Sequence, residues 1–279
     1  MSKLTIACLQ LTSQADWQRN LKQILEHMKA CLSDSPRLIV LPENAFLFDA
    51  KQLREVAEGQ ATQDIMAAMQ AFAKAHQVYV LIGSHPLATR PDGEPVSAGR
   101  VRQTSLMIDD QGEVVARYDK VHLFDVTVDD KASVYQESRF IEPGEVQAVT
   151  VDIDDVRVGL SICYDLRFPE FYRLLADQGA QVCFVPSAFT HRTGEAHWHC
   201  LLQARAIENQ LYMAGVNQVG WHTSTRQTYG NTVAYSPWGK CLGKLDDEQT
   251  GHLSFTVDSA ELEVVRQAMP CLQHRRVGR

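Results

Sequence analysis

Short continuous apolar runs alternate along this chain with longer segments of helical periodicity. Two of these runs, at residues 38–41 and 182–185, are each followed directly by a proline. Such a run is typical of a strand covered on both faces, and proline cannot continue the hydrogen-bond ladder of a central strand. Segments such as 52–76 and 196–209 place apolar residues at the period of an amphipathic helix. The alternation predicts a layered α/β fold, with helices covering sheets built from both halves of the chain.

The same apolar runs and periodic segments predict where the individual strands and helices lie. Strands are expected at 4–8, 37–43, 78–84, 101–109, 113–118, 156–163 and 181–186, and helices at 16–32, 52–76, 169–178 and 196–209. Ser13 is a possible cap for the first helix. The pair 101–109 and 113–118 forms a hairpin that turns at Asp110–Gly112, and a polar loop is expected from about 127 to 145.

Length and composition restrict the class of protein. The chain has 279 residues, 45% of them hydrophobic, which is enough for one large α/β domain or two small ones. We expect one domain over 1–279, with a core at about 3–258 and a tail at about 259–279. Its formal charge of −7 comes from interspersed residues and leaves no basic stripe, so nucleic acid is not an expected partner. No run reaches the roughly 20 apolar residues of a membrane span, and the N-terminus resembles a strand, not a signal peptide.

The seven cysteines are scattered singly and include no C-x-x-C pair, which argues against a disulfide framework or a zinc ribbon. A reducing cytoplasm is the expected location.

Three reactive residues fall at corresponding places, at or just beyond the C-terminal end of a predicted strand. They are Glu43, Lys120 and Cys163. The sheets of α/β proteins present functional groups at these ends, so the three side chains could meet there. Each one alone has an ordinary structural interpretation, because cysteine is often a small buried hydrophobe, lysine a solvated charge and glutamate a capping or pairing group.

The residues around these three positions resemble the glutamate, lysine and cysteine motifs of the nitrilase, or carbon–nitrogen hydrolase, superfamily. The motifs are Leu-Pro-Glu at 41–43, Tyr-Asp-Lys-Val-His-Leu-Phe-Asp at 118–125 and Ile-Cys-Tyr-Asp-Leu-Arg-Phe-Pro-Glu at 162–170, and further likeness continues at 186–189, 193–198, 204–207, 229–230 and 236–239. The resemblance implies a four-layer α-β-β-α sandwich in a single domain, whose chains usually pair as homodimers or higher homo-oligomers. It also implies a cysteine hydrolase that needs no metal and no organic cofactor.

The resemblance implies a role for each member of the triad. A free thiol is only a few per cent thiolate at neutral pH, so the nucleophile Cys163 needs a neighbouring base, which would be Glu43. Lys120, together with the backbone N–H of Tyr164, would stabilise the negative oxygen of the tetrahedral intermediates. The segment 135–138, Tyr-Gln-Glu-Ser, resembles one that brings a second glutamate to the site, so Glu137 is the fourth catalytic candidate. Glu142 and Glu145 compete with it.

Several motifs are most similar to the Nit branch of the superfamily, whose members hydrolyse deaminated glutathione or ω-amides of 2-oxo acids. The ending Gln-His-Arg-Arg at 273–276 favours the first substrate. Hydrolysis of its amide would release 2-oxoglutarate and cysteinylglycine, whereas an ω-amidase would act on 2-oxoglutaramate or a related small aliphatic amide. The chain departs from the branch at 127–131 and at Glu195, which both border the expected pocket, so the two substrates remain alternatives.

Other interpretations of the reactive residues are weaker. The histidines at 197 and 199 lie two residues apart on a predicted helix and therefore face different ways, which is unsuitable for zinc. We expect His197 to satisfy a buried hydrogen bond, and Arg167 and Glu170 to form structural pairs. A papain-like Cys–His pair is disfavoured because Cys163 follows a strand. The remaining six cysteines are expected to be packing residues, and a scaffold or binding protein on the same fold is the non-enzymatic alternative.

Overall fold

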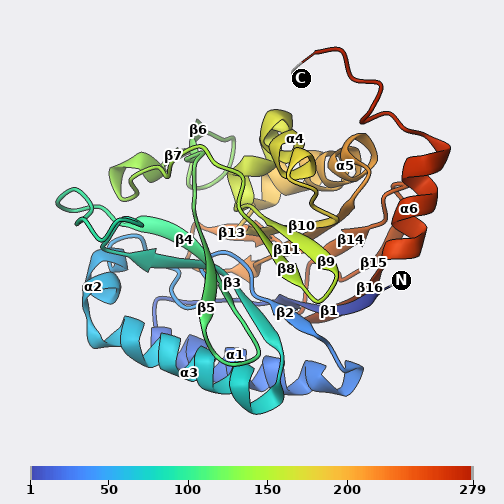
Figure 1. The fold of residues 1–279 in the computed structure, drawn as a ribbon. Helices are drawn as coiled ribbons and strands as arrows, with labels where there is room; N and C mark the ends of the chain where they lie inside the picture. Colours follow the sequence, from blue (N-terminus) through green and yellow to red (C-terminus); the bar gives the residue numbers. More distant parts are fainter. Residues whose placement is uncertain (1, 278–279) are drawn as a thin grey trace.

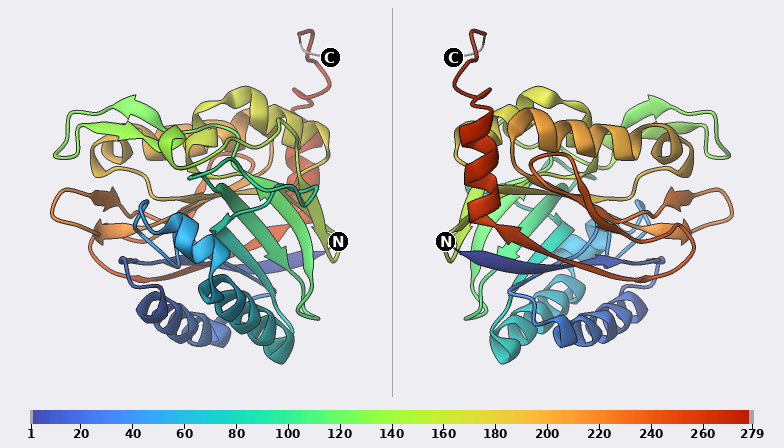
Figure 2. Two further views of the ribbon diagram at one scale, coloured as in Figure 1. Left: turned by 90° about the vertical axis from the view of Figure 1, so that its left-hand side faces the viewer. Right: turned by 90° about the vertical axis from the view of Figure 1, so that its right-hand side faces the viewer.

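The computed structural model describes residues 2–277 and has four layers (Figures 1 and 2). One helical layer contains α1 (Trp17–Cys31) and α3 (Gln60–His76), and the opposite layer contains α4 (Pro169–Asp177) and α5 (His191–Asn209). Two sheets lie between these layers. The predicted α-β-β-α sandwich is confirmed.

The two sheets have six strands each. The first has the order β16 (Gly251–Asp258), β1 (Lys3–Gln10), β2 (Leu38–Val40), β3 (Tyr79–Leu87), β4 (Arg102–Ile108) and β5 (Val114–Asp119). The second has the order β15 (Cys241–Lys244), β14 (Val233–Tyr235), β11 (Tyr212–Asn217), β10 (Val182–Ser187), β9 (Val156–Leu160) and β8 (Thr150–Ile153). In each sheet three central strands are parallel and the outer pairs are antiparallel.

Strand β1 shows why these runs form central strands. Leu4, Ile6 and Cys8 belong to the large core that joins the two sheets, while Ala7 and Leu9 belong to the core beneath α1 and α3. Successive side chains of a strand point to opposite faces, so an uninterrupted apolar run can fill both cores. Each fully buried large aliphatic side chain contributes on the order of 2 kcal/mol of transfer free energy.

The single helix predicted at 52–76 is divided into α2 (Leu53–Glu58) and α3. The break lies at Gly59, whose extended backbone, with ψ 179°, both ends α2 and begins α3. A Cβ atom at this position would lie 2.7 Å from the carbonyl oxygen of Glu55, so any other residue would force the backbone to shift. Helical periodicity continues across the break and does not reveal it.

Two helix starts also differ from the prediction. Helix α1 is capped by Asp16, which accepts a hydrogen bond from the Arg19 N–H at 3.0 Å, while Ser13 is buried and donates to the carbonyl of Ala45. Helix α5 begins at 191 instead of 196, with Thr190 as its cap. Gly194 lies in its first turn and packs closely against Tyr229, because a Cβ at this position would lie 2.3 Å from that side chain.

The predicted polar loop at 127–145 contains regular structure. β6 (Asp125–Thr127) pairs with β7 (Val134–Gln136), and a 3-10 turn, η2, follows at Glu137–Arg139. A second small pair consists of β12 (Val219–Trp221) and β13 (Gln227–Tyr229). Two further 3-10 turns are η1 (Leu32–Asp34) and η3 (Cys163–Arg167).

Helix α6 (Ser259–Ala268) follows β16 and runs along one side of the sandwich (Figure 2). Its Leu262 is part of the large core, and its Arg266 donates to the carbonyls of Ala180 and Gln210. Within the part of the chain that the structure describes, none of the helices combines the length and apolarity that a membrane crossing requires.

Candidate active site

Cys163 is the first residue of η3, three residues after the end of β9. Its side chain is buried and its φ is +44°, in the left-handed region that residues other than glycine seldom adopt. This conformation costs on the order of 1–2 kcal/mol and persists only where surrounding contacts hold it. Contacts in the folded protein therefore hold the backbone in the conformation that positions this thiol.

Asp165 supplies those contacts and joins the cysteine motif to the lysine motif. It is fully buried, and its Oδ2 accepts hydrogen bonds from the Ile162 N–H at 2.8 Å and from the Tyr118 hydroxyl at 2.7 Å. Its Oδ1 lies 2.7 Å from Nδ1 of His122. One carboxylate thus fixes the turn that carries Cys163 relative to the segment that carries Lys120.

Lys120 directly follows β5, and its ammonium lies between two carboxylates. Nζ is 2.8 Å from Oε1 of Glu43 and 2.8 Å from Oε1 of Glu137. The ammonium is almost completely buried, so its charge is stabilised by these two partners and not by water. Burial alone would lower the pKa of Lys120, but the charges of Glu137 and Glu43 raise it well above its usual value, and the ammonium stays protonated.

Glu43 follows β2, and each of its carboxylate oxygens accepts a hydrogen bond. Oε1 accepts from Lys120, and Oε2 accepts from the backbone N–H of Ala188 at 2.8 Å. The Gln218 side chain also donates to the Glu43 backbone carbonyl at 3.0 Å. These bonds come from both sheets and hold the carboxylate in one orientation beside the thiol.

The site disfavours a resting thiolate. Burial raises the pKa of Cys163, the negative charge of Glu43 raises it further, and Lys120 opposes both effects. The thiol is therefore protonated at rest, and it must lose its proton as it attacks. A carboxylate beside a protonated thiol is the arrangement that this chemistry requires.

Glu137 lies on η2, within the segment 127–145 that the sequence predicts to be a polar loop. Its Oε1 binds Lys120, and its Oε2 accepts from the Phe124 N–H at 2.6 Å. Burial and the nearby Glu43 raise its pKa, while Lys120 lowers it. Of its two competitors, Glu142 is instead bound by the guanidinium groups of Arg90 and Arg102. Glu145 is exposed, and neither it nor Glu142 lines the cavity at the site.

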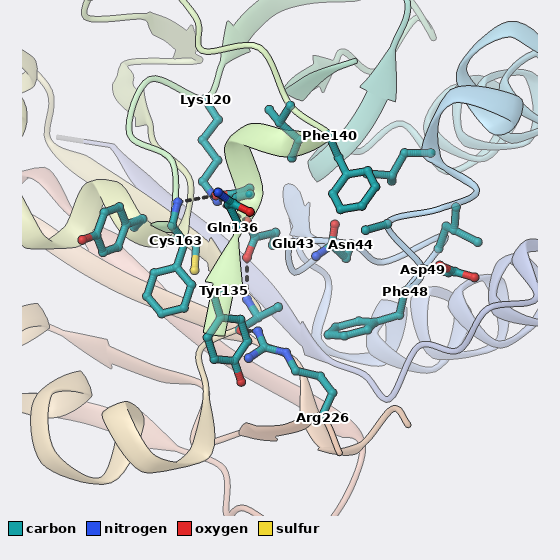
Figure 3. A pocket seen from close by; sticks show the side chains of 18 of the residues that line it. Glu43, Asn44, Phe48, Asp49, Lys120, Tyr135, Gln136, Phe140, Cys163 and Arg226 are labelled. Carbon is teal, nitrogen blue, oxygen red and sulfur yellow. Dashed lines mark hydrogen bonds and ion pairs between the residues drawn. The ribbon is translucent and has the colours of Figure 1, made fainter. Parts of the chain in front are cut away.

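These groups open into one cavity of about 490 Å³, a size suited to a small-molecule ligand. Figure 3 shows the side chains of Glu43, Lys120 and Cys163 converging on one part of it. All five residues named from the sequence line it, including Tyr164, together with aromatic rings that include Phe48, Tyr135 and Phe140. The remaining wall includes the guanidinium of Arg226, beside β13.

Sequence reasoning missed Asp165, Phe48 and Arg226. Asp165 lies within the cysteine motif, and its place two residues after Cys163 was an available signal. Phe48 and Arg226 lie in irregular segments with no pattern of their own, and only the tertiary fold brings them to the cavity. Arg167 lies near the site, with its guanidinium 5.2 Å from the ring centre of Phe189.

Two predictions about single residues are wrong. His197 is exposed and does not satisfy a buried hydrogen bond, since its Nδ1 lies at the surface, 3.3 Å from the partly buried Arg167 guanidinium. Cys200 and Cys241 are exposed and are not packing residues, whereas Cys8, Cys31 and Cys183 are buried as expected. Among residues 2–277, no group of three or more His, Cys, Asp or Glu side chains could hold a metal ion.

Comparison with known proteins gives a consistent result. The family model described as carbon-nitrogen hydrolase matches residues 5–267. A protein of Yersinia enterocolitica named deaminated glutathione amidase is 40% identical over 277 residues, which are 99% of this chain and 94% of that protein.

Two solved structures share the fold. The Caenorhabditis elegans NitFhit protein has a TM-score of 0.88 at 32% identity, and the match covers 99% of this chain and 66% of that one. A glutamate-to-glutamine mutant of an amidase from Nesterenkonia has a TM-score of 0.80 at 26% identity, covering 98% and 94% of the two chains. In that mutant the acetamide moiety of fluoroacetamide is covalently added to the active-site cysteine.

The family model matches nearly the whole chain, and the glutamate, lysine and cysteine motifs of this chain converge on one cavity. This chain therefore belongs to the carbon–nitrogen hydrolase family, within the nitrilase superfamily, and is an amide hydrolase.

Proposed function

We propose that this enzyme hydrolyses the amide bond of deaminated glutathione to 2-oxoglutarate and cysteinylglycine, with Cys163 as nucleophile. The observation that carries the mechanism is the buried Lys120 ammonium, held at 2.8 Å by both Glu43 and Glu137 beside the Cys163 thiol. The substrate is supported by the full-length likeness to proteins named deaminated glutathione amidase, at 33–40% identity.

In the acylation half-reaction, Glu43 accepts the Sγ proton of Cys163 as sulfur bonds to the carbonyl carbon. The oxygen of the tetrahedral intermediate is stabilised by the Lys120 ammonium and the backbone N–H of Tyr164, and loss of one such donor typically costs ~10²–10³ in rate. The C–N bond then breaks, and Glu43 passes the proton to the departing amine. Cysteinylglycine leaves, and a 2-oxoglutaryl thioester remains on Cys163.

In the deacylation half-reaction, Glu43 takes a proton from a water molecule whose oxygen attacks the thioester carbon. The C–S bond breaks, the proton returns to sulfur, and 2-oxoglutarate leaves. Glu137 orients Lys120 and helps to position this water, since its carboxylate is held by Lys120 and by the Phe124 N–H.

Glu137→Gln is expected to lower kcat by about 10- to 100-fold, because an amide binds the buried ammonium far less strongly than a carboxylate does. Steady-state kinetics measure this loss, with thermal unfolding monitored in parallel to establish that the variant is folded. Glu145→Gln is the matched control, because this exposed carboxylate lies outside the cavity and its loss should leave kcat unchanged. Wild-type turnover in Glu137→Gln would remove Glu137 from the mechanism.

The second candidate function is that of an ω-amidase acting on 2-oxoglutaramate or a related small amide. The acyl halves of the two substrates are the same, so the same chemistry serves both. A scaffold or binding protein is the non-enzymatic candidate. It is disfavoured by the burial and mutual contacts of the nucleophile, base and ammonium, which a binding surface does not require.

We also propose a cytoplasmic homodimer or higher homo-oligomer of one domain over 1–279, with a core at about 3–258 and a C-terminal tail at about 259–279 whose helix α6 packs onto that core through Leu262. Large exposed apolar side chains on and beside the outer helical layer support self-association. Leu174 of α4 is 43% exposed, Ile207 of α5 is 49% exposed and Trp238 is 61% exposed. Apolar surface of this kind becomes buried when copies of a chain associate.

The experiment that tests the proposed function is acid quenching of the enzyme during turnover of deaminated glutathione, followed by mass spectrometry of its peptides. The proposal predicts one 2-oxoglutaryl group on the peptide that contains Cys163, with cysteinylglycine and 2-oxoglutarate released in equal amounts. Turnover with an acyl group on another residue would refute the role of Cys163, and no turnover of this compound would refute the substrate.

A further inference from the structure

Arg226 is a cationic group in the cavity to which no motif assigns a role. It lies just before β13, and its guanidinium is 4.7 Å from the ring centre of Tyr135 and 5.9 Å from that of Phe48 (Figure 3). The two rings belong to different segments of the cavity wall. They hold the planar guanidinium against apolar surface and leave its N–H edge for polar contacts.

The hydrogen bonds of this guanidinium are incomplete. Nη2 donates to the carbonyl of Ala188 at 2.7 Å, whereas Nη1 is buried and has no hydrogen-bond partner among residues 2–277. No carboxylate in that range forms an ion pair with Arg226. Asp49, the other acidic group of the cavity apart from Glu43 and Glu137, accepts instead from the Lys51 N–H and the Gln52 amide. A buried cationic donor without a partner is costly unless a ligand binds it.

The position of Arg226 relative to Glu43 indicates which half of a substrate it faces. One residue, Ala188, accepts from Arg226 through its carbonyl and donates to Oε2 of Glu43 through its N–H. The group that protonates a departing amine must lie within hydrogen-bond reach of its nitrogen. The amine half of the substrate therefore extends from the Glu43 side of the reacting carbon, where Arg226 lies.

We propose that Arg226 binds the terminal carboxylate of the amine half of the substrate and thereby selects a peptide-like amide over an unsubstituted one. This inference rests on the proposed function, and it identifies Arg226 as the residue that determines which class of amide the enzyme hydrolyses. A two-residue amine half spans at most ~7 Å when extended, which is short enough to remain inside this cavity. Arginine suits the task because its fork of N–H groups matches a carboxylate.

The test compares kcat/KM of wild type and Arg226→Gln on deaminated glutathione, which carries this carboxylate, and on 2-oxoglutaramate, which lacks it. The variant is expected to lose about 10- to 100-fold on deaminated glutathione. On 2-oxoglutaramate the loss should be less than about threefold, so the ratio of the two values changes by roughly tenfold or more. Arg226→Lys keeps the charge and should recover part of the loss. Arg192→Gln is the matched control, because Arg192 lies on α5 with a side chain 62% exposed.

The outcomes separate this inference from the proposed function. Equal losses on both substrates would place Arg226 on the acyl half or in a structural role, and no loss on either would mean that it binds no part of the substrate. Both results overturn the inference while the wild type still turns over deaminated glutathione. A wild type inactive on that compound would refute the proposed substrate, and with it the carboxylate assigned to Arg226.

Discussion

Cys163→Ala is expected to lower kcat for amide hydrolysis by on the order of 10⁴-fold or more, because the variant cannot form the thioester and must rely on binding and charge stabilisation alone. The substitution removes only a sulfur atom from a buried position, so the fold should remain intact. The measurement is single-turnover release of product at enzyme concentrations high enough to detect the residual rate, with circular dichroism as the check on folding.

Cys200→Ala is the matched control for this variant. Cys200 is an exposed cysteine on the outer helical layer, and its replacement should leave kcat unchanged. A Cys163→Ala enzyme that retained a substantial fraction of wild-type turnover would contradict the assignment of the nucleophile. Absence of amide hydrolysis by the folded wild type would instead favour the scaffold interpretation.

Glu43→Gln is expected to lower kcat by ~10²–10⁴-fold, because glutamine cannot accept the thiol proton. The same change should make the thiol more acidic. The negative charge of Glu43 raises the pKa of Cys163, so its removal should lower that pKa and shift the pH profile of alkylation by iodoacetamide to lower pH. Hydrolysis and alkylation should thus change in opposite directions at neutral pH.

This divergence distinguishes a base from a structural residue. If Glu43 only supported the fold, both reactions would fall together, or neither would change. Glu145→Gln again serves as the control, since it removes an exposed carboxylate without altering the charge beside the thiol. Hydrolysis by Glu43→Gln at the wild-type rate would exclude proton transfer through this side chain.

The catalytic candidates could be predicted from the sequence for a physical reason. Central strands can be recognised in the sequence as continuous apolar runs. The residue types that follow their C-terminal ends are therefore known without any knowledge of tertiary structure. Glu43, Lys120 and Cys163 meet because β2, β5 and β9 all end on one side of the sandwich. The motifs then identify which of many strand-end residues carry chemistry.

Other parts of the site depend on contacts between segments far apart in the chain. The position of Glu137 is set by β6, β7 and η2, in a stretch whose polar composition suggested a loop. Arg226 meets Tyr135 and Ala188, which lie 91 and 38 residues earlier in the chain. The local sequence at 222–227 does not indicate these neighbours, because the contacts of Arg226 form only when distant segments pack together.

The measurement that tests the central claim most directly is a competition assay with deaminated glutathione and 2-oxoglutaramate at equal concentrations. It uses wild type and Cys163→Ala, with loss of each substrate followed separately. The wild type is expected to consume deaminated glutathione first, and Cys163→Ala is expected to consume neither compound. Preferential consumption of 2-oxoglutaramate would identify an ω-amidase instead, and consumption of either compound by Cys163→Ala at a rate near that of the wild type would contradict the mechanism.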